Sequence, residues 1–187
     1  MKYLKDLKKS SPEDATNKIY LVLALIFLSA SIIITVDTGE ETDFTTDSVN
    51  IIDGDTLEAS RNSSTVTVRL LGVDTPETQI QNNPTEYGME DNSETRECLN
   101  EWGEKATEFA KGFTTGKVSI STDPASRKYG DYNRLLAYVE TDNGTLNEAL
   151  IKKGYARVYE SDFSQVERYI ELESEAREKD KGLWACN

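Results

Sequence analysis

IIDGDT at residues 51–56 and VRLLGVDTPET at residues 68–78 are the two stretches that decide the fold of this chain. Each begins with apolar or β-branched residues, which favour a strand, and continues into Asp, Gly, Thr or Pro, which favour a turn. A strand that runs into a polar turn presents its last side chains at one end of a sheet. The two stretches therefore predict that Asp55 and Asp74 end separate strands, and that they converge if those strands are neighbours.

The rest of the chain extends this pattern into an α+β domain. Strands are expected where polar and apolar residues alternate: two short ones in 48–59, then 65–73, 117–122 and 134–139. Helices are expected where apolar residues recur every three or four positions: 99–113, 146–153 and 166–176. Ser164 and Glu167 have the spacing of a capping box at the start of the last helix. This order of elements is typical of a five-stranded Greek-key barrel of the OB type with three helices.

The N-terminal segment has a different composition. Residues 19–36 are an unbroken run of 18 uncharged, mostly apolar residues, which as a helix of ~27 Å would span a bilayer. Lysines precede the run and acidic residues follow it, which predicts that residues 1–18 are cytoplasmic and that the main domain lies outside. The alternative is a cleaved signal peptide. Residues 37–47 are acidic and rich in threonine, which is typical of a linker, so the folded domain is expected to span 48–187.

The charge of the chain bears on the kind of substrate and on the salt concentration at which the protein works. The net charge is −13, and because the first 36 residues hold five basic and three acidic side chains, the rest carries 16 basic against 31 acidic ones. Proteins that bind nucleic acid usually have a basic footprint. Either the substrate is not a polyanion, or the protein works in concentrated salt, where at ~1 M the Debye length falls to about 3 Å. The composition favours the second explanation, a halophilic or high-salt source.

The chain contains two cysteines, Cys98 and Cys186, and no histidine. An exported chain with an even number of cysteines is expected to form a disulfide, with two buried free thiols as the alternative. The absence of histidine excludes Ser-His-Asp hydrolysis and any mechanism with an imidazole base. Two cysteines without histidine also cannot complete a zinc site of the usual kind. Catalysis would have to depend on carboxylates, arginines, tyrosines and a metal ion.

Oxygen ligands for a metal ion are concentrated in the two opening stretches. Asp55, Asp74 and the backbone carbonyl of Thr75 offer the hard oxygen donors that Ca²⁺ prefers. An Asp-Gly-Asp-Thr run alone is as well explained as a simple turn. The combination of both carboxylates with an arginine-bearing strand is what favours a metal site.

Two arginines and a glutamate complete the candidate chemistry. Arg69 lies in an apolar strand, where a buried arginine needs a partner, either a structural salt bridge or a bound phosphate. Arg134 opens a strand directly after a polar loop, within reach of the same phosphate. Glu77 follows the second acidic turn and is placed to orient or deprotonate a water molecule, although a solvated surface charge is the simpler explanation. Together these are the parts that a metal-assisted phosphodiesterase needs.

These residues carry a resemblance to the staphylococcal nuclease (thermonuclease) family. Four motifs match it in order, and GLW at 182–184 follows them: IIDGDT at 51–56, VRLLGVDTPET at 68–78, RLLAYV at 134–139 and LNEALIKKGYARV at 146–158. The resemblance covers residues 48 to 184. It implies an OB barrel with three helices that hydrolyses DNA and RNA with Ca²⁺, cleaving the bond to the 5′ oxygen and leaving 3′-phosphate ends. A monomer is expected.

The resemblance also implies a role for each candidate residue. Ca²⁺ would be bound by Asp55, Asp74 and the Thr75 carbonyl. Arg69 and Arg134 would contact the scissile phosphate, and Glu77 matches the residue usually called the general base. The alternatives are a nucleic-acid-binding module with an inactive site and a surface Ca²⁺-binding domain. An inactive copy would be expected to have lost one of these residues, and none is lost.

The chain departs from the family pattern just before Arg134. The family's usual run is Asp-Lys-Tyr-Gly-Arg, and the best match here is DYNR at 131–134. This alignment places Asn133 in a left-handed turn that is normally glycine, which asparagine tolerates. It favours Tyr132 over Tyr129 as the tyrosine that contacts phosphate, although both remain open. Tyr159 resembles an aromatic residue near the nucleotide pocket of the family.

Overall fold

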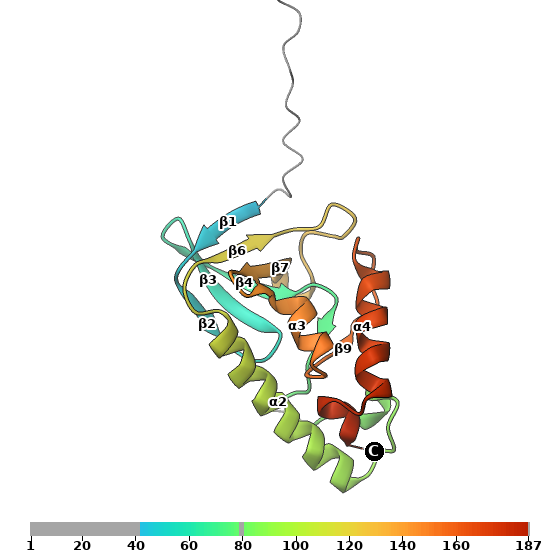
Figure 1. Cartoon of the computed structure of the whole chain (residues 1–187). Coiled ribbons are helices and arrows are strands. Elements are labelled where there is room, and N and C mark those ends of the chain that lie inside the picture. Colours follow the sequence, from blue (N-terminus) through green and yellow to red (C-terminus); the bar gives the residue numbers. More distant parts are fainter. Residues whose placement is uncertain (1–41, 79–80, 187) are drawn as a thin grey trace, which may run out of the picture. The chain divides into compact units, whose positions relative to one another are not determined.

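Seven strands form one mixed sheet in the computed structural model, which describes residues 42–78 and 81–186. The strands are β1 (Thr42–Thr46), β2 (Val49–Ile51), β3 (Thr56–Arg61), β4 (Ser64–Leu70), β6 (Val118–Ser121), β7 (Leu135–Thr141) and β8 (Gly144–Thr145). Their order is β1-β6-β7-β4-β3-β2, with β8 paired to β7. β4 and β7 are parallel, whereas β3 and β4 are antiparallel. β1 lies close to β3, near the other end of the path, so the sheet curls back on itself (Figure 1).

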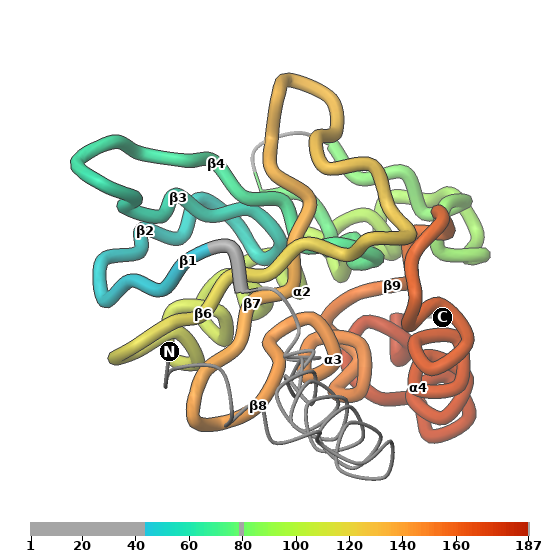
Figure 2. The backbone as a smooth tube through the Cα atoms, turned by 90° about the horizontal axis from the view of Figure 1, so that it is seen from above, coloured from blue at the N-terminus to red at the C-terminus, as the bar shows by residue number. Residues whose placement is uncertain are grey.

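In the part of the chain that the structure describes, three α-helices pack beside the sheet. They are α2 (Ser93–Phe113), α3 (Leu146–Lys152) and α4 (Val166–Glu178). The described residues also form three short 3-10 helices: η1 (Pro84–Tyr87) before α2, η2 (Asp131–Asn133) between β6 and β7, and η3 (Gly182–Ala185) after α4. α3 packs on both β7 and α4, and Figure 2 shows strands β1 to β4 and β6 on one side of the domain with α3 and α4 on the other. A separate two-stranded ladder pairs β5 (Val73–Asp74) with β9 (Arg157–Val158).

The apolar side chains form two clusters. The larger one fills the space between the sheet and helices α3 and α4, where Leu146, Leu150 and Ile151 are fully buried. The smaller one gathers around the start of α2 and the C-terminal η3, with Leu99 and Leu183 at its centre. The expected disulfide between Cys98 and Cys186 is confirmed and lies at this second cluster, joining Cα atoms 5.8 Å apart. It ties the C-terminal end of the chain to helix α2.

Asn147 connects the sheet to α3 through one buried side chain. Its Oδ1 accepts the backbone N–H of Val139 at 3.0 Å, and its Nδ2 donates to the carbonyl oxygens of Leu71 at 3.0 Å and Ala137 at 3.2 Å. Asn147 is fully buried, so no water can replace these contacts from the surface. The amide therefore fixes the turn that follows β4 relative to β7.

We expect Asn147→Ala to lower the free energy of unfolding by about 3 kcal/mol, because it removes the hydrogen-bond partner of the buried Val139 N–H and Leu71 carbonyl. The Ala137 carbonyl keeps the hydrogen bond from the Leu71 N–H. Urea denaturation followed by circular dichroism measures the change. Asn143→Ala, in the exposed turn between β7 and β8, is the matched control and should leave the midpoint nearly unchanged. Equal midpoints for the wild type and Asn147→Ala would contradict the proposed role of this amide.

The predicted α+β class and the three helices are confirmed. Five strands were expected, whereas the described residues form nine, seven in the mixed sheet and two in the β5–β9 ladder. Part of the difference is β1, which lies in the segment 37–47 that was expected to be a linker. This expectation is wrong over Thr42–Thr46, because β1 pairs with β6 and Phe44 packs against the larger cluster.

The segment 19–36 lies outside the described residues. Within 42–78 and 81–186, no helix is long and apolar enough to cross a membrane.

Two local expectations are also corrected. The strand expected over 65–73 breaks after Leu70, because Gly72 has a φ of +73° and a Cβ there would lie 2.5 Å from the Phe163 ring. The expected capping box does not form, since α4 begins at Val166 without a side-chain cap. The hydroxyl of Ser164 instead donates to Asp123 at 2.8 Å. The backbone N–H of Ser164 also donates to Asp123, at 2.7 Å.

Candidate active site

Arg69 bridges the two predicted metal-binding carboxylates. Its Nη1 donates to Oδ1 of Asp55, and its Nη2 donates to Oδ1 of Asp74 at 2.6 Å. Strand pairing places Arg69 opposite Thr56, next to Asp55. The turn at Gly72 then returns the chain so that Asp74 reaches the same guanidinium. The structure therefore brings Asp55, Arg69 and Asp74 together.

The Asp55 carboxylate is held on every side. Its Oδ2 accepts the backbone N–H of Thr75 at 2.9 Å, and its Oδ1 accepts the hydroxyl of Thr56 at 3.0 Å. Asp55 is only 2% exposed. The preceding Gly54 allows this close packing, since a Cβ there would lie 2.8 Å from the side chain of Thr75. The carboxylate is thus fixed before any ligand binds.

The electrostatics of this cluster show surplus negative charge. Burial raises the pKa of Asp55 from 3.8 to about 7, opposed by Arg69 and reinforced by Asp53 and Asp74. Although burial opposes it, the carboxylates of Asp55 and Asp74 raise the pKa of the Arg69 guanidinium. Three carboxylates, those of Asp53, Asp55 and Asp74, face two guanidinium groups, those of Arg69 and Arg157, which leaves a net negative site that a cation would neutralise.

The donor set fits a hard cation such as Ca²⁺. One carboxylate oxygen of Asp55 and one of Asp74 accept hydrogen bonds from the same guanidinium, that of Arg69, and carboxylate oxygens are the ligands that Ca²⁺ prefers. Within the part of the chain that the structure describes, no group of three or more acidic, cysteine or histidine side chains could hold a metal ion. The remaining ligands would therefore have to be backbone carbonyls, such as the predicted Thr75 carbonyl, and water, both of which Ca²⁺ accepts.

Glu77 lies three residues beyond Asp74, on the exposed side of the site. Burial raises the pKa of its carboxyl above the ordinary value, reinforced by Asp53 and opposed by Arg69. The Asp74 carboxylate also raises the pKa of Glu77, and the Arg134 guanidinium lowers it. These interactions place Glu77 within the electrostatic reach of the same cluster.

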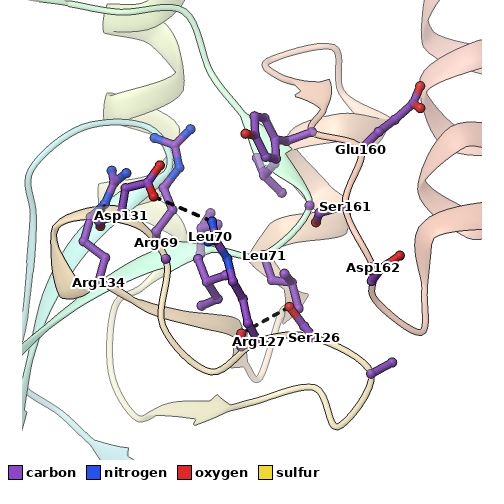
Figure 3. Close-up of a pocket in the computed structure, with 16 residues that line it drawn as sticks. Arg69, Leu70, Leu71, Ser126, Arg127, Asp131, Arg134, Glu160, Ser161 and Asp162 are labelled. Carbon is purple, nitrogen blue, oxygen red and sulfur yellow. Dashed lines mark hydrogen bonds and ion pairs between the residues drawn. The ribbon is translucent and has the colours of Figure 1, made fainter.

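Arg69 and Arg134 line one cavity of about 480 Å³. Arg134 follows η2, and its Nε donates to the carbonyl oxygen of Asp131 at 3.2 Å. Figure 3 shows both arginines on the same side of the cavity, with Glu160 and Asp162 across from them. The two guanidinium groups predicted to contact phosphate are therefore brought to one cavity.

The two predicted substrate-binding tyrosines are placed differently. Tyr159 lines the cavity and is half-exposed, and its backbone N–H donates to the Gly72 carbonyl at 3.1 Å. Tyr132 is 93% exposed and does not line the cavity, although its ring centroid lies 5.7 Å from Cζ of Arg134. Asn133 has the expected left-handed φ of +57°. Tyr132 has one too, at +58°, which the sequence did not predict.

Arg157 is a site residue that the sequence reasoning missed. β9 pairs it with Asp74, and its Nη2 lies 2.7 Å from Oδ2 of Asp74 and 3.4 Å from Oε2 of Glu86. Asp74 is thereby held between two arginines, Arg69 on one oxygen and Arg157 on the other. The signal available in the sequence was a second arginine within a strand-like run, since a partly buried arginine needs an acidic partner.

Comparison with known proteins identifies one matching family model and several similar proteins. A family model described as staphylococcal nuclease homologue matches residues 67–186. An uncharacterized protein of Methanocaldococcus jannaschii is 41% identical over 143 residues, which are 73% of this chain and 69% of that protein. An endonuclease of Bacillus subtilis is 34% identical over 72% of this chain and 58% of its own length. A thermonuclease of Staphylococcus hyicus is 30% identical over 73% of each chain.

Proposed function

Because this chain belongs to the staphylococcal nuclease family, we propose that it is a Ca²⁺-dependent nuclease that hydrolyses phosphodiester bonds of DNA and RNA. Relatives named endonuclease and thermonuclease support a nuclease function in general. The observation that carries the finer proposal is the guanidinium of Arg69, which bridges Asp55 and Asp74 at the edge of a cavity that Arg134 also lines.

Each residue of the site has a role in this proposal. Asp55, Asp74 and the Thr75 carbonyl would hold Ca²⁺, which when bound supplies positive charge against the phosphate oxygens. Arg69 and Arg134 donate hydrogen bonds to the same phosphate and stabilise the negative charge that develops in the transition state. Because two carboxylates already fix Arg69, it needs little rearrangement when the substrate arrives.

Glu77 would orient the attacking water molecule and accept its proton. A general base is most effective when its pKa lies near the working pH, and the raised pKa of Glu77 moves it in that direction. Attack on phosphorus with departure of the 5′ oxygen would leave 3′-phosphate ends. Tyr159, which lines the cavity, would contact a nucleotide, as would Tyr132, whose ring centroid lies 5.7 Å from Cζ of Arg134.

We also propose that the nuclease domain acts outside the cell membrane and tolerates concentrated salt. This rests on the apolar segment 19–36 with its flanking charges and on the acidic composition of the rest. Repulsion between an acidic protein and a polyanionic substrate is screened at high ionic strength, whereas contacts within the site persist.

The decisive experiment is an assay of the full-length protein in detergent on single-stranded DNA, duplex DNA and RNA. Each substrate is tested with Ca²⁺ and then with a chelator, at low and high salt. We expect cleavage that requires Ca²⁺, with 3′-phosphate ends identified by end-group analysis. The absence of metal-dependent cleavage at both salt concentrations would refute the proposal. Binding without cleavage would instead identify a nucleic-acid-binding module.

Glu77→Gln is expected to lower kcat by a factor of about 10²–10⁴, the usual contribution of a positioned general base. The substitution keeps the size of the side chain and removes its ability to accept a proton. Steady-state cleavage of single-stranded DNA with Ca²⁺ measures the effect. Glu90→Gln, an exposed glutamate of the same loop, is the control and should retain the wild-type rate. An unchanged kcat in Glu77→Gln would show that this carboxylate is not the base.

A further inference from the structure

Asn82 ties the backbone of Glu77 to helix α2. Its Oδ1 accepts the Glu77 N–H at 2.7 Å, and its Nδ2 donates to the Glu77 carbonyl oxygen at 3.0 Å. The same Nδ2 donates to Oδ1 of Asn100, on α2, at 2.6 Å. Asn82 is 4% exposed although it lies in a polar loop. One buried amide therefore satisfies both backbone groups of the residue that carries the proposed base.

The chemistry of these contacts requires asparagine. A backbone N–H can only donate and a carbonyl can only accept, so the orientation of the Asn82 amide is fixed by Glu77. An aspartate at this position would place a second oxygen against the Glu77 carbonyl, and an alanine would leave both backbone groups without this partner. The oxygen of this buried amide accepts one hydrogen bond and its nitrogen donates two. Such a network fixes the backbone of Glu77 in one position.

The backbone around Glu77 also lies directly against α2. A Cβ added at Gly103, on the helix, would lie 2.5 Å from the carbonyl oxygen of Pro76 and 2.9 Å from that of Glu77. Gly103 is buried in the middle of the helix, where glycine is otherwise unfavourable. The helix thus contacts the Glu77 backbone directly at Gly103 and, through Asn100, supports the Asn82 amide that binds this backbone.

We propose that Asn82, supported by Asn100, is a positioning residue that holds Glu77 in the orientation needed to activate water. The inference rests on the nuclease function proposed above and names the part of the fold that sets its general base. Glu77 lies between β5 and α2, outside any helix or strand, so no ladder of backbone hydrogen bonds fixes it. A displacement of about 1 Å in a catalytic group can lower a rate by about 10²-fold.

The first test compares two neighbouring asparagines in the full-length protein. Asn82→Ala is expected to lower kcat by about 10²-fold while KM for single-stranded DNA changes little, because the substrate contacts of Arg69 and Arg134 remain. Asn83→Ala is the matched control, since Asn83 is exposed and bonds to Thr85 and Glu86 rather than to Glu77. Wild-type kcat in a folded Asn82→Ala protein would overturn the inference.

A double-mutant cycle with Glu77→Gln separates positioning from general stability. If Asn82 acts through Glu77, adding Asn82→Ala to Glu77→Gln should cause no further loss of rate. An equal loss in both backgrounds would overturn the inference and leave Asn82 a structural residue. A wild-type protein without Ca²⁺-dependent cleavage would instead refute the proposed function itself. Hydrogen exchange would then test whether Asn82 holds the Glu77 backbone. The Glu77 amide should be protected in the wild type and lose that protection in Asn82→Ala.

Asn100 provides a second test that does not depend on the folding of Asn82→Ala. Asn100→Ala removes the acceptor for Nδ2 of Asn82, and we expect it to lower kcat. Asn100→Asp keeps that acceptor, so its kcat should be close to that of the wild type and higher than that of Asn100→Ala. Equal rates for Asn100→Ala and the wild type, with unchanged protection of the Glu77 amide, would overturn the inference that α2 supports the base through this pair.

Discussion

Arg69→Ala is expected to lower the rate of phosphodiester cleavage by a factor of about 10³–10⁵, the contribution of an arginine that stabilises a phosphoryl-transfer transition state. The reason is geometric as well as electrostatic. Two carboxylates hold the guanidinium at the edge of the cavity, with Nη2 2.6 Å from Asp74. A planar fork held in this way presents its remaining N–H groups to a phosphate in a fixed direction.

The same substitution should also destabilise the metal-free protein, by about 3–5 kcal/mol, because it removes the positive charge that Asp55 and Asp74 share. Asp55 is buried and would be left without its cationic partner. Arg69→Lys restores the charge without the two-pronged contact, so it should recover much of the stability and little of the rate. Chemical denaturation in the presence of a chelator, together with cleavage rates in Ca²⁺, measures both effects.

This pair of variants also separates the two explanations of a buried arginine in an apolar strand. If Arg69 were only a structural salt bridge, the folded fraction of Arg69→Lys would cleave as fast as the wild type. Arg127→Ala is the control, since Arg127 lines the same cavity but makes only a 3.8 Å ion pair with Asp131. It should change the rate by much less than Arg69→Ala. Equal losses in the two alanine variants would assign the effect to the general charge of the cavity.

The sequence predicted those features that local pattern controls. Polar turns after strands indicated that Asp55 and Asp74 lie at strand ends, and the left-handed backbone of Asn133 followed from its replacement of a glycine. What the pattern could not show was how Asp74 returns to Arg69 after only five residues. That depends on the turn at Gly72, which breaks the expected strand and is filled by the ring of Phe163, more than ninety residues away in the chain.

Contacts between distant residues account for the remaining differences. Ser164 has the spacing of a helix cap, but its N–H and hydroxyl both donate to Asp123. The Asp123 carboxylate is held in place by further hydrogen bonds from Tyr138 at 2.5 Å and Ala125 at 2.8 Å. These hydrogen bonds lower the pKa of Asp123 although burial opposes them. Asn82 was likewise one polar loop residue among many in the sequence. Its role depends on the fold, which brings Asn82 within hydrogen-bond distance of both Glu77 and Asn100.

Removing the disulfide between Cys98 and Cys186 is expected to lower the free energy of unfolding by about 4.5 kcal/mol on the chain-entropy estimate. The bond closes a loop between residues 88 positions apart, so its loss greatly increases the freedom of the unfolded chain. For a domain of this size the change corresponds to a decrease in Tm of roughly 10–20 °C. The Cys98→Ser/Cys186→Ser double variant, compared with the wild type by thermal and urea denaturation, measures it.

The folded double variant should keep a cleavage rate close to that of the wild type, because the apolar contacts of Leu99 and Leu183 around the missing bond remain. Reductant provides the matched control. It should lower the Tm of the wild type to that of the double variant and leave the double variant unchanged. A wild-type Tm that does not respond to reductant under conditions that reduce the bond would show that the second cluster, rather than the covalent link, holds the C-terminal end in place. Retained Tm together with a reduced cleavage rate would instead indicate that the bond acts on α2 and, through Asn100, on the site.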